Sequence, residues 1–219
     1  RGRTSHMPSR NVIKEFAADE YYHVYNRGVE KRDIFIDDQD YTVFLGLLKK
    51  YLSPIAKVRS PNSNRHKFES LSSQLDLITY CLMPNHFHLL FYQYNEEAIT
   101  KLMRRVVTGY VMYFNNRYKR VGTLFQGRYK AAHINADAYL HHISRYIHMN
   151  PKEYKTDPNS SLPYYLGHKK IPTWLKPNAI LELFDNDPKQ YEKFLNEYQN
   201  TNLELSILKW QLANDPEDL

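Results

Sequence analysis

The stretch Leu75–Tyr92 reads LDLITYCLMPNHFHLLFY, and it decides the fold. Two apolar segments, Leu75–Leu82 and His86–Tyr92, flank the tripeptide Met83-Pro84-Asn85, which has the chemistry of a turn. We therefore expect two antiparallel strands joined by a tight connection. An acid, a proline, an asparagine and two histidines interrupt the stretch, so it does not form a membrane span of about 20 apolar residues.

Strands and helices are predicted to alternate on both sides of this hairpin. A strand at Tyr21–Arg27 and a helix at Asp38–Leu52 precede it. A long helix at Glu96–Tyr118, an extended piece at Arg128–Ile134 and a helix from Ala136 to Asn150 follow it. The order β-α-β-β-α-β-α predicts an α+β fold, in which an antiparallel sheet has its helices packed on one face.

The 219 residues have the length of one compact domain with a small addition. Arg1–Met7 (RGRTSHM) is typical of an expression-vector remnant, and residues 11–155 are assigned to the main domain. Residues 156–170 are expected to form a linker, and residues 171–219 a helical C-terminal extension. The short helices expected there are Leu175–Phe184, Pro188–Tyr198 and Leu203–Leu212.

Several classes of protein are excluded by simple patterns. The chain has seven glycines and contains neither G-x-x-x-x-G-K-[ST] nor G-x-G-x-x-G, which argues against kinase-like and dinucleotide-binding proteins. The single cysteine, Cys81, lies in a hydrophobic strand and cannot form an internal disulfide. With no signal-peptide pattern before the fold, we expect a cytoplasmic protein without a membrane partner.

The net charge of +6 is unevenly distributed along the chain. Residues 98–136 contain eight Lys or Arg and no acid, whereas residues 181–219 carry nine acids and three lysines. Aromatic residues are interspersed through the basic segment, a combination that suits a phosphate backbone with stackable bases. The alternative is a solvated basic helix face with core aromatics beneath it, and the missing acids favour the nucleic-acid interpretation.

The tripeptide His86-Phe87-His88 lies inside a predicted strand. Because side chains alternate along a strand, both imidazoles project to one face and Phe87 points into the opposite layer. Two such histidines can share a metal ion, or they can be two unrelated, partly buried histidines. The chain is too short for an amidohydrolase barrel of about 250 residues, and it lacks the third alternating histidine of the histidine-triad hydrolases.

The helix from Ala136 to Asn150 is expected to supply the other half of the site. It carries side chains at spacings of three and four: Tyr139, His142, Tyr146 and Asn150. Tyr146 and Asn150 share a face. A tyrosine hydroxyl is a competent nucleophile toward a metal-bound phosphate, and an amide oxygen can complete a metal shell begun by two imidazoles. Any one of 19 tyrosines is more often a packing ring, but the register with Asn150 and the helix stop at Pro151 single out Tyr146.

Four strings together carry a resemblance to a known family. They are YHVYNRG (22–28), YCLMPNHFHLLF (80–91), FQGRYKA (125–131) and SRYIHMNP (144–151). In this order and at these intervals they resemble the single-tyrosine HUH transposases of insertion sequences, and more closely the REP-associated tyrosine transposases. The resemblance extends from about Phe16 to Pro151, with a weaker similarity at Trp174-Leu175 and Tyr191–Phe194. It implies a ferredoxin- or RRM-like HUH endonuclease domain over residues 11–155.

The resemblance also implies a chemistry for individual residues. His86 and His88 correspond to the paired metal ligands, Asn150 to a further ligand and Tyr146 to the nucleophile. The implied reaction cleaves single-stranded DNA beside a hairpin, leaving a 5′-phosphotyrosine and a free 3′-hydroxyl. The implied ion is Mg²⁺ or Mn²⁺; two imidazoles favour Mn²⁺ and abundance favours Mg²⁺. The polar loop Ser53–Gln74 and the acidic C-terminal tail depart from the family pattern.

Other residues are candidates for holding the DNA, although for each alone a plain surface charge is as common. They are Asn26, Arg27, Lys101, Arg104, Arg105, Arg117, Gln126, Arg128 and Lys130. His142 is expected to be a solvent-exposed helix residue rather than a base or ligand, and His133, His141 and His148 to be bystanders. The alternative function is a domesticated, non-catalytic DNA- or RNA-binding module. In either case we expect a monomer or a homodimer. The complete set of His86, His88, Tyr146 and Asn150 favours the enzyme.

Overall fold

The computed structural model describes residues 15–54, 69–134 and 137–197. Four strands form one antiparallel sheet in the order β2-β3-β1-β4. The strands are β1 (Glu20–Arg27), β2 (Leu75–Met83), β3 (His86–Gln93) and β4 (Lys130–Ile134). The helices between and after them are α1 (Asp38–Leu52), α2 (Ala98–Arg117) and α3 (Asp137–His148). The predicted element order and the antiparallel α+β fold are confirmed.

Local contacts explain where the hairpin turns. Met83 pairs with His86 across β2 and β3, so Pro84 and Asn85 make the turn. The carbonyl oxygen of Pro84 accepts hydrogen bonds from the backbone N–H groups of Ile34 (2.7 Å) and Phe35 (2.9 Å). These bonds fasten the turn to the segment before α1 and fix the end of the sheet at which His86 lies.

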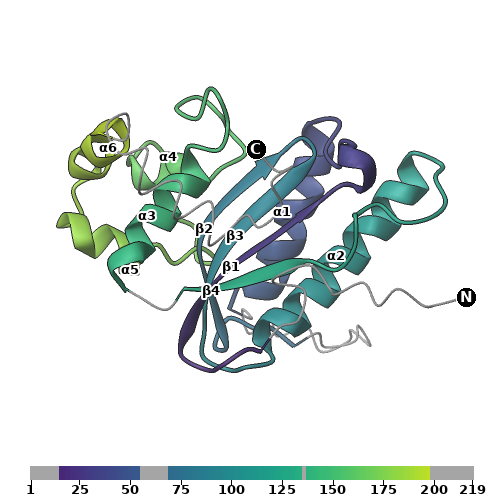
Figure 1. Ribbon diagram of the computed structural model, residues 1–219, viewed down its shortest axis with the longest axis horizontal. Coiled ribbons are helices and arrows are strands. Elements are labelled where there is room, and N and C mark those ends of the chain that lie inside the picture. The colour runs from purple at the N-terminus through teal and green to yellow at the C-terminus, as the bar shows by residue number, and fades with distance from the viewer. Residues whose placement is uncertain (1–14, 55–68, 135–136, 198–219) are drawn as a thin grey trace, which may run out of the picture.

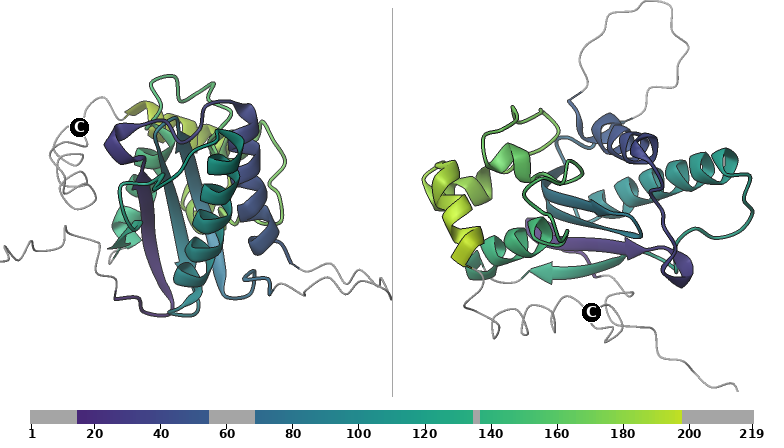
Figure 2. Two further views of the ribbon diagram at one scale, coloured as in Figure 1. Left: turned by 90° about the vertical axis from the view of Figure 1, so that its right-hand side faces the viewer. Right: turned by 90° about the horizontal axis from the view of Figure 1, so that it is seen from above.

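The sheet separates two apolar clusters. On β3, Phe87, Leu89 and Phe91 pack with α1 and α2, whereas Leu90 faces the opposite cluster with α3. An irregularity between Leu77 and Thr79 shifts the pairing of β2 with β3. Figures 1 and 2 show α1 and α2 on one side of the sheet and α3 with the later helices on the other.

This arrangement corrects the expectation that the helices pack on one face only. Strands β2 and β3 are buried along nearly their whole length. A strand that is apolar on both sides needs cover on both sides. α3 supplies that cover with Leu140, Ile143 and Ile147, all of which are buried.

The segment 156–170 is not the linker that its composition predicts. It contains the short helix α4 (Leu162–Tyr165), and both end residues of that helix are buried. The hydroxyl of Tyr165 donates to the carbonyl oxygen of Ile78 on β2 (2.9 Å). The apolar side chains inside this polar string therefore pack onto the sheet, so the segment is part of the domain.

The C-terminal extension continues on the same side of the sheet. It contains α5 (Asn178–Leu181), the 3₁₀ turn Glu182–Phe184 and α6 (Pro188–Asn196), in agreement with two of the three expected short helices. The expected helix Leu203–Leu212 and the expected remnant Arg1–Met7 lie outside the described residues. In the part of the chain that the structure describes, no helix is long and apolar enough to cross a membrane.

Candidate active site

His86 and His88 project from the same face of β3, and their ring centroids lie 5.0 Å apart at an interplanar angle of 87°. Phe87, between them, is buried in the cluster beneath α1 and α2. Because side chains alternate along the strand, the two imidazoles lie on the face of the sheet that α3 covers, opposite the cluster that contains Phe87.

Both ring nitrogens of His86 face amide oxygens. Nδ1 lies 2.6 Å from Oδ1 of Asn85, and Nε2 lies 3.1 Å from Oδ1 of Asn150. Asn85 donates through Nδ2 to the carbonyl oxygen of Lys31 (3.3 Å), which fixes the orientation of its amide. A neutral imidazole has only one N–H. When that hydrogen is bonded to Asn85, the lone pair on Nε2 and the oxygen of Asn150 face each other.

This pair of atoms fits a metal ion. Two ligands at right angles around an ion bonded at about 2.1 Å lie about 3 Å apart, close to the 3.1 Å between His86 Nε2 and Asn150 Oδ1. Within the described ranges no group of three or more His, Cys, Asp or Glu side chains is placed to hold a metal. A set of two imidazoles and one amide would suit a transition-metal ion or Mg²⁺ that keeps positions open for other oxygen ligands.

His88 is held by a residue that sequence reasoning did not select. Its Nδ1 lies 2.9 Å from Nε2 of His23 on β1, and the two rings are stacked at 5.0 Å. Burial lowers the pKa of His23 to about 3. Burial, followed by the charges of His23 and His86, also holds the pKa of His88 well below its usual range. Both rings are therefore neutral near pH 7, the state in which an imidazole binds a metal.

Tyr146 lies over this histidine pair. Its ring centroid is 5.5 Å from that of His88 and 6.1 Å from that of His23, both in edge-to-face geometry. Tyr146 is on the last turn of α3, and Asn150 is the second residue after the end of that helix. The structure brings together all four side chains that the sequence indicates for the chemistry.

Strand β1 adds three side chains to this face. Tyr25 pairs with His88 and Arg27 with His86 across the strands, and His23 precedes them on the same side. Tyr25 stacks on His23 at 5.0 Å. The period of two in YHVYNRG is the signal that places the three on one face, but it does not reveal which strand lies beside β1.

Two of the predicted DNA contacts lie together beside His86. The Arg27 guanidinium donates to Oε1 of Gln126 through Nε (3.3 Å) and Nη2 (3.1 Å). Lys130 places Nζ 5.9 Å from the Tyr25 ring, also on this face, and Arg128 is exposed. Asn26 is turned inward, because its Nδ2 donates to the carbonyl oxygen of Gly127 (3.2 Å) and its Oδ1 accepts from the backbone N–H of Arg27. It ties β1 to the segment before β4.

The remaining predicted DNA contacts are on α2, which covers the opposite face of the sheet. Three of them form ion pairs with acids. Lys101 contacts Glu97 (2.9 Å), Arg105 contacts Glu69 (3.3 Å), and Arg117 contacts Asp37 (2.6 Å) and Asp40 (2.9 Å). Arg104 is exposed.

The fold therefore places acids from other parts of the chain beside residues 98–136, a segment that contains no acid. Three of the aromatic residues of that segment, Tyr110, Phe114 and Phe125, are buried in the core and are not available for stacking. On α2 the structure matches the alternative of a basic helix face with core aromatics beneath it. The structure brings Arg27, Gln126 and Lys130 to the side of the candidate active site but not the α2 residues.

The other histidines lie outside the cluster. His148 is fully buried, with Nδ1 2.8 Å from the hydroxyl of Tyr191 and Nε2 2.7 Å from Oγ of Ser161, so it joins α3 to the C-terminal extension. His142 is not an isolated surface histidine, because its Nδ1 lies 2.9 Å from Arg145 and its ring packs near Phe194.

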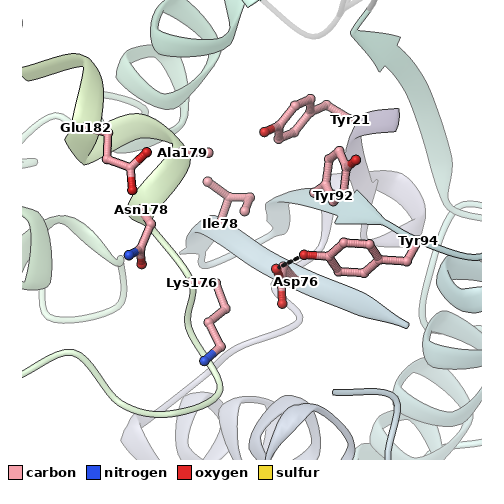
Figure 3. A pocket seen from close by; sticks show the side chains of 9 residues that line it. All are labelled: Tyr21, Asp76, Ile78, Tyr92, Tyr94, Lys176, Asn178, Ala179 and Glu182. Carbon is pink, nitrogen blue, oxygen red and sulfur yellow. Dashed lines mark hydrogen bonds between the residues drawn. The ribbon is translucent and has the colours of Figure 1, made fainter. Parts of the chain in front are cut away.

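A pocket of about 500 Å³ lies at the other end of the strands (Figure 3). Tyr21, Tyr92 and Tyr94 line one side, and Lys176, Asn178 and Glu182 line the other. Tyr94 donates to Oδ2 of Asp76 (2.8 Å). The pocket shares no lining residue with the histidine and tyrosine cluster, so it is separate from the candidate active site.

The chain is similar to solved structures of known proteins. The fold is similar to that of a REP-associated tyrosine transposase solved in complex with a REP hairpin. The TM-score is 0.50 at 13% identity, and the match covers 75% of this chain and 89% of that one. A "putative transposase" from Deinococcus radiodurans R1 matches with a TM-score of 0.37 at 14% identity, over 64% of this chain and 95% of that one.

No curated protein matches the sequence. The family model described as "Transposase IS200 like" matches residues 61–150, the segment that carries His86, His88, Tyr146 and Asn150. The resemblance expected from the four sequence strings is thereby supported: this segment is similar to IS200-like transposases.

Proposed function

We propose that the chain is a metal-dependent endonuclease and strand transferase of single-stranded DNA that works through a covalent bond to Tyr146. The observation that carries the proposal is that side chains from α3 and the residues after it lie against the two histidines of β3. The Tyr146 ring on α3 lies 5.5 Å from the His88 ring on β3, and Asn150 Oδ1 lies 3.1 Å from His86 Nε2. The match of residues 61–150 to IS200-like transposases supports the same reaction class.

His86, His88 and Asn150 would hold a divalent cation, Mg²⁺ or Mn²⁺, which when bound polarises the scissile phosphate. Arg27 pairs directly with His86 across the strands, so its guanidinium would supply a second positive charge to a phosphate bound beside His86. Gln126 holds that guanidinium in place through two hydrogen bonds.

Tyr146 supplies the nucleophile. Its Oη forms a bond to phosphorus while the bond from phosphorus to the 3′-oxygen breaks. The phenol loses its proton to solvent, and the leaving 3′-oxygen takes one up as it becomes a hydroxyl. Because a phenol has a pKa near 10, it leaves more readily than a sugar alcohol. Attack by another 3′-hydroxyl therefore reverses the step and joins strands without ATP.

The substrate we propose is a single strand that flanks a DNA hairpin. The REP-associated transposase of similar fold is bound to a REP hairpin. In this chain Arg27, Arg128 and Lys130 offer positive charge on or beside the face that carries Tyr146. Such charges hold a phosphate backbone and set the position of the strand without reading its sequence.

The test is a covalent adduct. Hairpin oligonucleotides with single-stranded flanks and a label at the 3′ end are incubated with the protein and Mn²⁺, and the products are separated on a denaturing gel. A labelled protein band is expected from the unmodified chain and none from Tyr146→Phe. Tyr139→Phe, an exposed tyrosine of the same helix, is the matched control and should keep the adduct.

An adduct of undiminished yield with Tyr146→Phe would mean that another tyrosine is the nucleophile. DNA binding by the unmodified chain without any adduct would favour the other candidate, a DNA- or RNA-binding module that lacks catalysis.

A further inference from the structure

His23 is a buried histidine whose side chain contacts His88, one of the candidate metal ligands. Its side chain is 1% exposed, and its Nε2 lies 2.9 Å from Nδ1 of His88. Its ring centroid lies 5.0 Å from that of Tyr25 and 5.0 Å from that of His88, and its plane is nearly parallel to both. His23 is outside the H-x-H tripeptide and on a different strand, so only the pairing of β1 with β3 brings it to the site.

The short distance between the two nitrogens restricts their hydrogens. Only one hydrogen fits between nitrogens 2.9 Å apart, and a neutral imidazole has one N–H in total. If the hydrogen belongs to His23, His88 carries its own hydrogen on Nε2 and cannot bind a cation there. If it belongs to Nδ1 of His88, the Nε2 lone pair is available.

We propose that His23 is a positioning residue that accepts the Nδ1–H of His88 and thereby keeps Nε2 of His88 free to bind the catalytic cation. This inference rests on the proposed function, since it concerns the same cation. His23 does not contact the DNA in this scheme; it sets the tautomer and the ring orientation of a ligand.

The environment of His86 supports the assignment. Its Nδ1 faces Oδ1 of Asn85 at 2.6 Å, and its Nε2 faces Asn150. Asn85 can only accept at that oxygen, so His86 is held through Nδ1–H and offers Nε2. With His23 as acceptor, both histidines are held in the same way and present the same nitrogen.

The proposed hydrogen bond leaves the other ring nitrogen of His23, Nδ1, without a hydrogen-bond partner among the described residues. When Nε2 of His23 accepts, its hydrogen is on Nδ1, and that buried atom has no hydrogen-bond partner among the described residues. A buried donor without a partner is unfavourable. The arrangement therefore depends on the bound cation to compensate for it, and the tautomer must be observed in the metal-loaded protein.

The experiment compares three variants with the unmodified chain. His23→Leu removes the acceptor, whereas His23→Gln keeps an amide oxygen at the position of Nε2. His133→Leu makes the same change at an exposed histidine of β4 and is the matched control. Mn²⁺ affinity is measured by titration calorimetry, and thermal unfolding without metal verifies that each variant is folded.

We expect His23→Leu to weaken Mn²⁺ binding about 10- to 100-fold, the usual effect of removing a hydrogen-bond partner of a metal ligand. His23→Gln should restore most of the affinity, and His133→Leu should leave it unchanged. In the Mg²⁺-loaded unmodified protein, nitrogen-15 NMR of the histidine rings should place the hydrogen of His88 on Nδ1. A purely structural role of His23 would not produce the rescue by glutamine, because glutamine replaces only the hydrogen-bond acceptor.

Equal Mn²⁺ affinity of His23→Leu and the unmodified chain would overturn this inference and leave the proposed function intact. A hydrogen on Nε2 of His88 in the loaded protein would overturn this inference together with the role of His88 as a metal ligand. Absence of Mn²⁺ and Mg²⁺ binding by the unmodified chain would overturn both.

Discussion

Asn150 and His86 lie 64 residues apart in the chain, yet Oδ1 of Asn150 is 3.1 Å from Nε2 of His86. The contact joins the end of α3 to the first residue of β3. It also connects two independent sequence features, the H-x-H strand and the Tyr146 helix. The position of α3 on the sheet therefore determines whether the nucleophile and the metal ligands meet.

The first prediction concerns the metal ligands. His86→Ala or His88→Ala should each abolish adduct formation, because removing a ligand weakens the site more than the roughly 10- to 100-fold effect of removing a ligand's hydrogen-bond partner. Asn150→Ala should reduce Mn²⁺ affinity less, since a neutral amide oxygen is a weaker ligand than an imidazole. The exposed Asn178→Ala is the matched control and should change neither quantity. Cleavage that continues undiminished in EDTA would contradict a metal-dependent reaction.

The second prediction concerns the path of the DNA. Lys130→Ala and Arg27→Ala should weaken binding of single strands and flatten its dependence on salt, at about 0.7 log units per log unit of salt for each phosphate that is no longer neutralised. Arg105→Ala should change the slope much less, because Arg105 is paired with Glu69 on the other face of the sheet. Fluorescence anisotropy over a salt series measures both slopes. A larger change with Arg105→Ala would instead place the strand along α2.

The sequence predicts the site residues that local patterns place, but not the residue that depends on strand pairing. Local periodicity is sufficient for His86, Phe87 and His88, since alternation alone assigns their faces. Spacing along a helix is sufficient to place Tyr146 near Asn150. His23 is missed because its contact with His88 depends on the pairing register of two strands, across 65 residues of chain, which no local pattern specifies.

The same reason applies to the charges of the basic segment. Residues 98–136 lack acids in the sequence, but Arg117 meets Asp37 across 80 residues and Arg105 meets Glu69 across 36. Charge patterning along a chain describes its neighbours in sequence, whereas ion pairs depend on neighbours in space. The error about the segment 156–170 is related, because the packing of Leu162 and Tyr165 on the sheet outweighs the polar composition around them.

The third prediction concerns a buried carboxylate that joins α1 to α2. Asp40 is fully buried and accepts hydrogen bonds from Tyr113 (2.8 Å), Tyr118 (2.9 Å) and Arg117 (2.9 Å). Asp40→Ala leaves the hydroxyls of Tyr113 and Tyr118 without this acceptor, and a buried donor without a partner costs about 1–3 kcal/mol. Asp38→Ala, at an exposed position of the same helix turn, should cost well under about 1 kcal/mol. Urea denaturation at pH 7 measures both, and similar values for the two variants would contradict the structural role of Asp40.

The last prediction concerns the stability of the fold at low pH. Burial lowers the pKa of His148 to about 3, so this ring stays neutral in the folded chain while an unfolded chain takes up a proton below pH about 6.5. The unfolded state then binds more protons, and stability falls as the pH decreases from about 6.5 toward 3. His148→Gln should be less stable than the unmodified chain at pH 7, because it disturbs the contacts with Tyr191 and Ser161, but should lose less stability between pH 7 and pH 5. The exposed His168→Gln serves as control and should keep the pH dependence of the unmodified chain. Urea denaturation at the two pH values gives the comparison, and an unchanged pH dependence in His148→Gln would mean that this histidine is not held neutral by the fold.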